Sequence, residues 1–188
     1  MFFMKTRSIQ ALVALAFLCF FNQIAQAQVD VTANPVGLLF GDLSVGADVQ
    51  LQEHLSVEAA VGFGTSKIDD IKGTNIPVNL VGKYYLNPKN GADRFYVDVF
   101  LRYVNRQWNY DSNSDYADFT SNRFGVGFGL GYKVVSSSGF VFDIGFGAGR
   151  ALVDNNSYTE NGMQQDVDWP NVMFQGKLGI GYRFGGKK

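Results

Sequence analysis

The chain has 188 residues, a formal net charge of −1 at neutral pH and a mean hydropathy of −0.03. Lysine and arginine are neither abundant nor clustered, so the electrostatic footprint of a nucleic-acid-binding protein is absent and no nucleic-acid partner is expected. A single cysteine also excludes the disulfide-rich scaffolds of small exported domains.

The first segment has the order of a secretory signal peptide. Two basic residues precede an apolar run at 11–21, and Ala25-Gln26-Ala27 provides small residues for a cleavage site. The apolar run is shorter than the ~20 residues of a transmembrane helix. We therefore expect 1–27 to be a cleaved leader that carries Cys19 away, and 28–188 to be one exported domain with 14 basic and 17 acidic residues.

The remaining chain alternates bulky apolar residues with small or polar ones. In Phe124-Gly125-Val126-Gly127-Phe128-Gly129-Leu130-Gly131-Tyr132 every even position is bulky and every odd position is glycine, so a strand would have one apolar face and one nearly bare face. Eight such segments predict an all-β fold, with strands at residues 29–40, 43–51, 55–64, 75–86, 94–104, 123–134, 140–152 and 171–184.

The predicted connections alternate in length along the chain. Compact turns are expected after the second, fourth and sixth strands, and long polar loops at 65–74, 105–122 and 153–170. Outer-membrane barrels have short periplasmic turns and longer outer loops, and about ten residues of tilted strand cross their apolar band. The order predicts an eight-stranded antiparallel up-and-down transmembrane β-barrel, with its amino terminus in the periplasm.

Aromatic residues gather at the predicted strand ends, where amphipathic rings prefer the headgroup level of a membrane. A periplasmic girdle is predicted from Tyr84, Phe95, Tyr132, Phe140, Tyr182 and Phe184. The opposite ends carry Phe63, Tyr103 and Phe124, with Trp108 and Trp169 as further candidates for a second girdle.

Volume indicates which face of the sheet points inward. Eight strands enclose an interior just wide enough for side chains to fill, so the many bulky residues are expected to face lipid. On the lipid side, a Lys or Arg at the membrane midplane would cost about 2–4 kcal/mol. We therefore predict an interior polar network of Asp48, Glu58, Asn79, Lys83, Asp98, Arg102, Asp143, Lys177 and Arg183.

One contact inside this network can be predicted from strand heights. Glu58, Lys83 and Asp98 lie at similar heights on three successive predicted strands, so Lys83 is expected between the two carboxylates. Such an interior would be a plug of ion pairs and hydrogen bonds. Free diffusion of nutrients through the barrel is therefore not expected.

Four short segments carry a family resemblance: Asn34-Pro35, Gly41-Asp42-Leu43-Ser44-Val45-Gly46, Leu55-Ser56-Val57-Glu58 and Gly179-Ile180-Gly181-Tyr182-Arg183-Phe184. They resemble an uncharacterised family of small outer-membrane β-barrels and, more broadly, the OmpA-type eight-stranded barrel domain. The resemblance implies outer-membrane lipids as surroundings and insertion by the barrel-assembly machinery. That machinery reads an aromatic residue at the end of the last strand, where this chain has Phe184 followed by four more residues.

The single histidine is the first candidate for chemistry. His54 lies in a predicted periplasmic turn next to Glu53 and close to Ser56, and a barrel hydrolase would need a base beside its nucleophile. Barrel enzymes that modify surface lipids work mostly near the outer leaflet, so His54 is at the wrong end. A solvated turn histidine is the favoured interpretation.

A second candidate is a partial calcium-loop pattern. Asp111, Asn113 and Asp115 place oxygen ligands at alternate positions, but no glycine follows Asp115 and the twelfth position is Asn122 instead of glutamate. An ordinary polar surface loop is favoured, and calcium binding stays open. The glycines keep a strict two-residue spacing within strands, which is not the glycine-rich turn of a nucleotide site.

The predicted loop at 153–170 contains Tyr158, Met163 and Trp169 among acids and amides. Exposed aromatic residues on a rigid scaffold suit sugars or protein partners. Anchoring of Trp169 in the headgroup zone is the simpler explanation.

The expected protein is a non-enzymatic integral outer-membrane barrel with a structural or surface-presenting role, without catalytic residues, metal or cofactor. Two alternatives stay open. One is an exported soluble barrel that holds an apolar ligand among inward-facing bulky residues. The other is an outer-membrane barrel enzyme that modifies lipids.

Overall fold

The computed structural model describes residues 28–35, 42–68, 71–112, 115–160, 163–166 and 170–185, and the predicted leader lies outside these ranges. Within them the chain forms nine β-strands: β1 (Val29–Ala33), β2 (Asp42–Gln52), β3 (Leu55–Ile68), β4 (Ile71–Tyr85), β5 (Arg94–Ser112), β6 (Asp115–Val135), β7 (Phe140–Glu160), β8 (Met163–Asp166) and β9 (Val172–Phe184). In the same ranges, no helix has the length and apolar character needed to cross a membrane.

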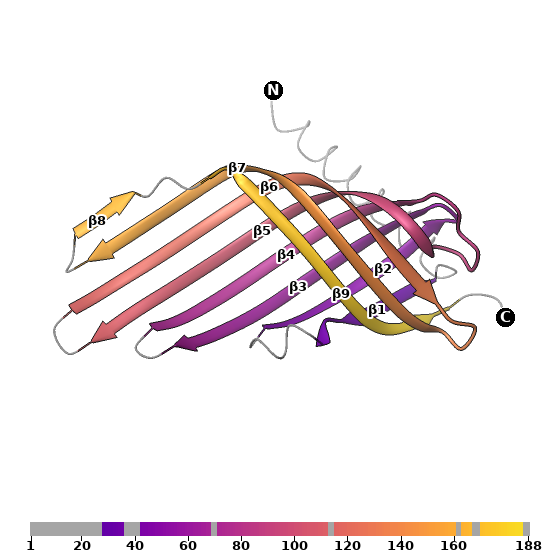
Figure 1. Cartoon of the computed structure of the whole chain (residues 1–188), viewed down its shortest axis with the longest axis horizontal. Helices are drawn as coiled ribbons and strands as arrows, with labels where there is room; N and C mark the ends of the chain where they lie inside the picture. Colours follow the sequence, from indigo (N-terminus) through magenta and orange to yellow (C-terminus); the bar gives the residue numbers. More distant parts are fainter. Residues whose placement is uncertain are drawn as a thin grey trace, which may run out of the picture.

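Eight of the strands close into a ring. The order is β1, β2, β3, β4, β5, β6, β7, β9, each antiparallel to its neighbours, and β9 pairs back to β1 with Val31 opposite Tyr182. The remaining strand, β8, is a short hairpin partner of β7 outside the ring. The predicted eight-stranded up-and-down barrel is confirmed, and Figure 1 shows its long tilted strands.

The strands extend much further than predicted at one end. β5 has 19 residues and β6 and β7 have 21 each, and β5 and β6 stay paired as far as Ser112 opposite Asp115. At about 3.3 Å per residue, 21 residues are about 70 Å long. At a tilt of about 45° this is a height of about 50 Å, roughly twice an apolar band of about 25 Å. In Figure 1, β3 to β7 continue to the left past the ends of β2 and β9.

The prediction of three long outer loops is therefore wrong for most of their length. Residues 65–68, 71–74, 105–112, 115–122 and 153–160 are strand, paired in register with their neighbours. These segments are mostly polar with a few isolated aromatic residues, so they lack the alternation of glycine with bulky apolar residues that marks the barrel strands. We call this part of the sheet the extension.

A β-bulge on β7 joins the barrel to the extension. The register shifts between the pairs Phe124–Val153 and Gly125–Ala151, which leaves Leu152 as the extra residue. Leu152 and Val153 are both exposed as a result. The inner face of the extension is consequently continuous with the barrel interior.

The bulky apolar face points outward, as predicted from volume. Phe128 is 72% exposed and Phe174 is 63% exposed, whereas Lys83 and Asp143 are buried. A barrel that packs its bulky residues around an apolar ligand is not the arrangement found. The outer surface is instead the kind of surface that a membrane interior covers.

The interior is less bare than predicted, because β5 turns large aromatic residues inward. Tyr96 and Phe100 are fully buried. They lie over the glycines of the neighbouring strands: a Cβ added to Gly127 would overlap Cζ of Phe100, and one added to Gly131 would overlap Cζ of Tyr96. The glycine runs thus provide space for the rings of Tyr96 and Phe100 inside the barrel.

Candidate functional site

Lys83 is the hub of an interior ion-pair network. Its Nζ lies 2.9 Å from Oδ2 of Asp48 and 2.9 Å from Oδ2 of Asp143, and it also forms an ion pair with Glu58. The three carboxylates come from β2, β7 and β3, so one ammonium group connects four strands of the ring. All four side chains are buried.

The predicted position of Lys83 between Glu58 and Asp98 is therefore half correct. Asp98 lies opposite Lys83 in the register of β4 and β5, but the ion pairs of Lys83 among the described residues do not include it, and Oδ1 of Asp98 is buried without a hydrogen-bond partner. The tilt and shear of a barrel bring residues from distant strands to the same height. Lys83 consequently meets carboxylates from across the lumen instead of its cross-strand neighbour.

Two further lysines complete the network. Lys177 on β9 lies 2.5 Å from Oδ2 of Asp143 and also pairs with Glu58. Lys133 on β6 lies 2.5 Å from Oδ2 of Asp48 and 2.9 Å from Oδ2 of Asp30. Because Asp48, Glu58 and Asp143 are each shared between two lysines, no single pair carries the whole cost of burying these charges.

Lys133 and Asp30 were not predicted as members of the network. Lys133 continues the inward-facing odd-numbered series of Gly125 to Gly131 by one step, so the period of two was a sufficient signal. Asp30 is opposite Arg183 in the register of β1 and β9, close to the chain's first described residues.

Tyrosine rings fill the space beside the lysines. The hydroxyl of Tyr96 donates a 2.8 Å hydrogen bond to Oδ1 of Asp143, and Nζ of Lys83 lies 4.9 Å from the centroid of the Tyr96 ring. Nζ of Lys133 lies 5.4 Å from the ring of Tyr85. These cation–π contacts add favourable surroundings for ammonium groups that are removed from water.

Arg183 binds the turn between β4 and β5 to the barrel interior. Its Nε and Nη2 donate hydrogen bonds of 2.6 and 2.8 Å to the two oxygens of Asp30, and Nη2 also lies 2.9 Å from the carbonyl oxygen of Ala92. Ala92 is buried against Tyr85 and Tyr96. The turn at 86–93 therefore folds inward at the end where β1 begins.

Two other residues that were predicted for the interior network, Asn79 and Arg102, lie apart from it. Nη1 of Arg102 donates a 2.8 Å hydrogen bond to Oδ1 of Asn79, across β5 and β4. The pair faces the lumen on the side toward the extension. The acceptor in this contact is an amide oxygen instead of a carboxylate.

The six residues predicted for the periplasmic girdle are all exposed on the outer face at one end of the barrel: Tyr84, Phe95, Tyr132, Phe140, Tyr182 and Phe184. Phe95 is opposite Tyr132, and Phe140 is opposite Tyr182. At the other end Trp108 does not join an outer girdle, because it faces inward on the extension, and Trp169 lies outside the described residues.

His54 has structural partners. Its Nδ1 lies 2.7 Å from the carbonyl oxygen of Tyr85, and its ring stacks on Tyr84 with centroids 5.7 Å apart. The hydroxyl of Ser56 is buried without a hydrogen-bond partner, so the two residues do not form a base–nucleophile pair.

Carboxylates gather at one place that could hold a cation. Oxygens of Asp48, Glu58 and Asp143 lie within 4.8 Å of one another, but Nζ of Lys83 lies among them and supplies the positive charge. In the segment with the partial calcium-loop pattern, Asp111 pairs with Tyr116 and Ser112 with Asp115. This segment is therefore a hairpin end, and Asn113 lies outside the described residues.

A closed antiparallel ring that is apolar outside and ion-paired inside has the architecture of outer-membrane β-barrels. The chain belongs to the family described as "Protein of unknown function (DUF3575)", whose model matches residues 11–182. No curated protein matches it.

Solved structures of outer-membrane proteins are similar to this chain. A major outer membrane protein from Thermus thermophilus has 18% identity and a TM-score of 0.55, covering 84% of this chain and 98% of that one. Acinetobacter baumannii CarO has 11% identity and a TM-score of 0.48, covering 85% and 97%. At 18% identity the likeness to the Thermus protein concerns the fold alone.

Proposed function

We propose that the protein is a non-enzymatic integral outer-membrane barrel that is closed to diffusing solutes and presents its extension outside the cell. The observation that carries the proposal is the contact between Lys133 and Asp48. Their strands, β6 and β2, are four places apart in an eight-membered ring, so this 2.5 Å ion pair joins opposite walls of the lumen.

Two other features support a closed lumen. Tyr96 and Phe100 lie beside the network and are fully buried. Arg183 holds the inward-folded turn at 86–93 through the carbonyl of Ala92. Ion-paired side chains, aromatic rings and an inward-folded turn thus fill an interior that is already narrow in an eight-stranded barrel.

A non-enzymatic role is supported by the partners of the residues that could do chemistry. His54 is bound to a backbone carbonyl and a tyrosine ring, and the buried carboxylates of Asp48 and Asp143 are bound to lysines. A nucleophile activated by a base is the minimum for lipid hydrolysis. The charged groups of the ion-pair network are bound to one another instead.

Conductance in planar lipid bilayers tests the proposal. Purified protein should give no stepwise current above the lipid baseline, measured beside a general porin as the positive control. The variant with both Lys133→Ala and Asp48→Ala loses the wall-to-wall pair and should leak more than the wild type. A steady open conductance of the unmodified protein would contradict a closed lumen.

A further inference from the structure

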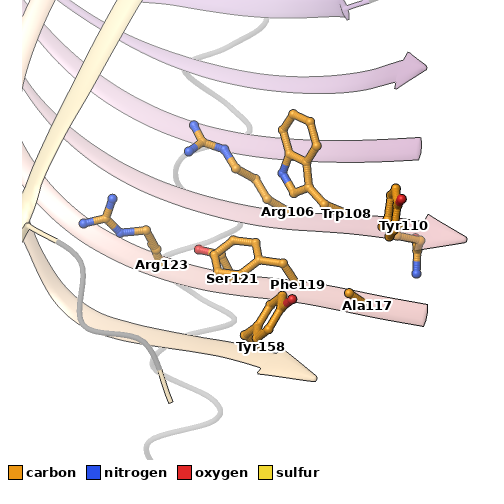
Figure 2. A pocket seen from close by; sticks show the side chains of 9 residues that line it. Arg106, Trp108, Tyr110, Ala117, Phe119, Ser121, Arg123 and Tyr158 are labelled. Atoms are coloured by element: carbon orange, nitrogen blue, oxygen red, sulfur yellow. The ribbon is translucent and has the colours of Figure 1, made fainter. Parts of the chain in front are cut away.

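The inner face of the extension carries a pocket of about 470 Å³. Ligand pockets in proteins commonly have volumes of about 300–1,000 Å³. Figure 2 shows side chains of the pocket on three neighbouring strands: Trp108 and Tyr110 from β5, Ala117 and Phe119 from β6, and Tyr158 from β7. The ion-pair network of the barrel interior includes none of these residues.

Three aromatic rings form a row across the pocket. Trp108 is directly opposite Phe119, and Phe119 is directly opposite Tyr158, so one ring comes from each of three adjacent strands. Because strands are about 4.8 Å apart, the row is about 10 Å long, which is more than one six-membered ring. The indole lies over Gly73 on the fourth strand, where an added Cβ would be 3.1 Å from Cε3 of Trp108.

The pocket is open on one side. In the described ranges, β2 pairs with β3 only as far as Asp42 opposite Gly64, and β9 pairs with β7 only as far as Val172 opposite Arg150. The sheet of the extension therefore does not close into a ring. Trp108 is 40% exposed and Tyr110 is 37% exposed. A ligand on these rings has one side against the protein and the other in water.

A half-open aromatic surface suits a sugar ring better than an apolar molecule. Pockets for small apolar ligands enclose most of the ligand surface, whereas an apolar ligand in this pocket would keep one face in water. A sugar ring has a face of C–H groups and a rim of hydroxyl groups. The C–H face covers an aromatic ring while the hydroxyl groups on the open side stay hydrated.

Polar groups beside the rings suit sugar hydroxyl groups. Ser121 and Asn156 lie on the barrel side of the row, opposite each other on β6 and β7, and are joined by a 2.6 Å hydrogen bond. Amide and hydroxyl groups both donate and accept hydrogen bonds, as sugar hydroxyl groups do. They provide the second kind of contact that a saccharide needs beside the aromatic row.

Arg123, which also lines the pocket, has an unused donor. The residue is only 8% exposed, and its Nε is buried without a hydrogen-bond partner. Buried donors in proteins nearly always have an acceptor, and a hydroxyl oxygen of a ligand would supply one. The charge of Arg123 is already balanced, because its Nη2 lies 3.0 Å from Oδ2 of Asp154. What this residue lacks is an acceptor, and an uncharged oxygen is sufficient.

We propose that this pocket binds a neutral oligosaccharide chain. The C–H faces of its sugars stack on Trp108 and on the rings of the row beside it. Its hydroxyl groups exchange hydrogen bonds with Ser121 and Asn156, and one of them accepts from Nε of Arg123. Because the row is longer than one ring, a chain of sugars makes more of these contacts than a single sugar does.

The facing of the pocket favours a free glycan chain over the headgroup of a neighbouring lipid. Trp108, Phe119 and Tyr158 lie on the face that continues the barrel interior, whereas surrounding lipids lie against the opposite face of the sheet. That the glycan comes from outside the cell rests on the proposed outward placement of the extension. Binding itself does not depend on that placement.

Binding is tested with the full chain, purified in a detergent without a sugar headgroup, against hexasaccharides of glucose, mannose, galactose and N-acetylglucosamine. At least one of them should bind, at least tenfold more tightly than its monosaccharide. Trp108→Ala should lower the affinity at least tenfold, and Trp108→Phe, which keeps a flat ring, should recover part of the loss. Phe63→Ala, which changes an outward ring that is 54% exposed, is the matched control and should leave binding unchanged.

A salt titration tests whether the recognised sugar is neutral. Raising sodium chloride from about 0.05 M to about 0.5 M should change the affinity less than about twofold, since screening weakens only contacts between charges. A large loss of affinity in salt, or a tenfold preference for uronic-acid hexasaccharides of equal length, would contradict a neutral ligand.

Each variant is first checked for the heat-dependent electrophoretic shift of a folded barrel, so that loss of binding is not loss of fold. Absence of binding to all of the neutral hexasaccharides overturns the proposal, as does binding that survives Trp108→Ala. Binding of 2-naphthol in the pocket without binding of any sugar also overturns it. A conducting barrel that binds these sugars would refute the closed lumen and leave the sugar site standing.

Discussion

Lys133 and Asp48 project from opposite walls of the barrel and meet with their charged atoms 2.5 Å apart. Neither residue is near the other in sequence or in the strand ladder, since 85 positions separate them along the chain. A contact of this kind constrains the ring across its full diameter. The proposed closure of the lumen depends on this contact.

Removing the central lysine should destabilise the barrel strongly. Lys83→Met leaves Asp48, Glu58 and Asp143 with one ammonium partner fewer each, and breaking a buried ion pair from one side costs about 3–5 kcal/mol. The free energy of unfolding, measured by urea titration in lipid vesicles, should fall by that amount. Lys72→Met, at an exposed position on the extension, is the matched control and should change it by less than about 0.5 kcal/mol.

Equal destabilisation by the two lysine variants would mean that charge number, and not the interior network, determines stability. A small effect of Lys83→Met alone would mean that the lumen admits water around the carboxylates. Either result would contradict the network as described.

The inner glycines should tolerate no methyl group. In Gly127→Ala the new Cβ would overlap Cζ of Phe100 and lie 2.5 Å from the carbonyl oxygen of Ala148, and overpacking of this kind costs about 1–3 kcal/mol. Gly82→Ala is the control, because a Cβ there meets nothing within 4 Å. The temperature at which the folded band is lost on electrophoresis gels should be lower for Gly127→Ala than for Gly82→Ala.

A second substitution shows which neighbour causes the strain. Phe100→Ala in the Gly127→Ala background removes the ring contact but keeps the backbone contact. The double variant should therefore be less destabilised than the sum of the effects of the two single variants. Strict additivity of the two changes would argue against the ring lying over the glycine.

The turn at 86–93 should open when Arg183 is replaced. Arg183→Lys keeps one positive charge but loses the fork that binds both oxygens of Asp30 and the carbonyl of Ala92. Hydrogen exchange of the Ala92 and Asp93 amides should become at least tenfold faster than in the wild type. Unchanged exchange would mean that packing of Ala92 alone holds the turn.

Labelling of intact cells tests the orientation. In a Cys19→Ser background, Lys72→Cys on the extension should react with a membrane-impermeant maleimide, because its position is exposed beyond the barrel. Lys89→Cys, in the exposed part of the opposite turn, should react only after the outer membrane is permeabilised. The reverse pattern would invert the barrel and place the extension in the periplasm.

Much of the ring could be predicted from the sequence because period-two alternation is a local property. The run from Phe124 to Tyr132 fixes both a strand and its two faces, since a slip of one residue would put every glycine on the wrong side. The same reasoning predicted that the six residues of the expected girdle share one end of the outer face.

The extension was missed because its strands lack the hydropathy contrast on which the prediction rested. Thr120 and Ser157, for example, pair across β6 and β7, and neither is apolar. Strand pairing there is maintained by continuity with the barrel ladder and by cross-strand aromatic pairs such as Trp108 and Phe119. The two residues of such a pair lie on different segments of the chain, so the pair cannot be recognised when each segment is considered alone.

The partners of Lys83 could not be predicted either, for a geometric reason. Asp98 is its neighbour in the ladder, but Asp143 is its neighbour across the lumen. Which of the two it meets depends on the shear of the ring, and that quantity emerges only when all eight strands are closed.

The central claim is that lipid, and not protein, surrounds the bulky face of the barrel. A bimane fluorophore on Phe128→Cys, in the Cys19→Ser background, tests it in vesicles containing brominated lipid, with Tyr110→Cys on the inner face of the extension as the comparison. The account predicts strong quenching at position 128 and little at position 110. Quenching that is weak at position 128, or equal at both positions, would contradict it.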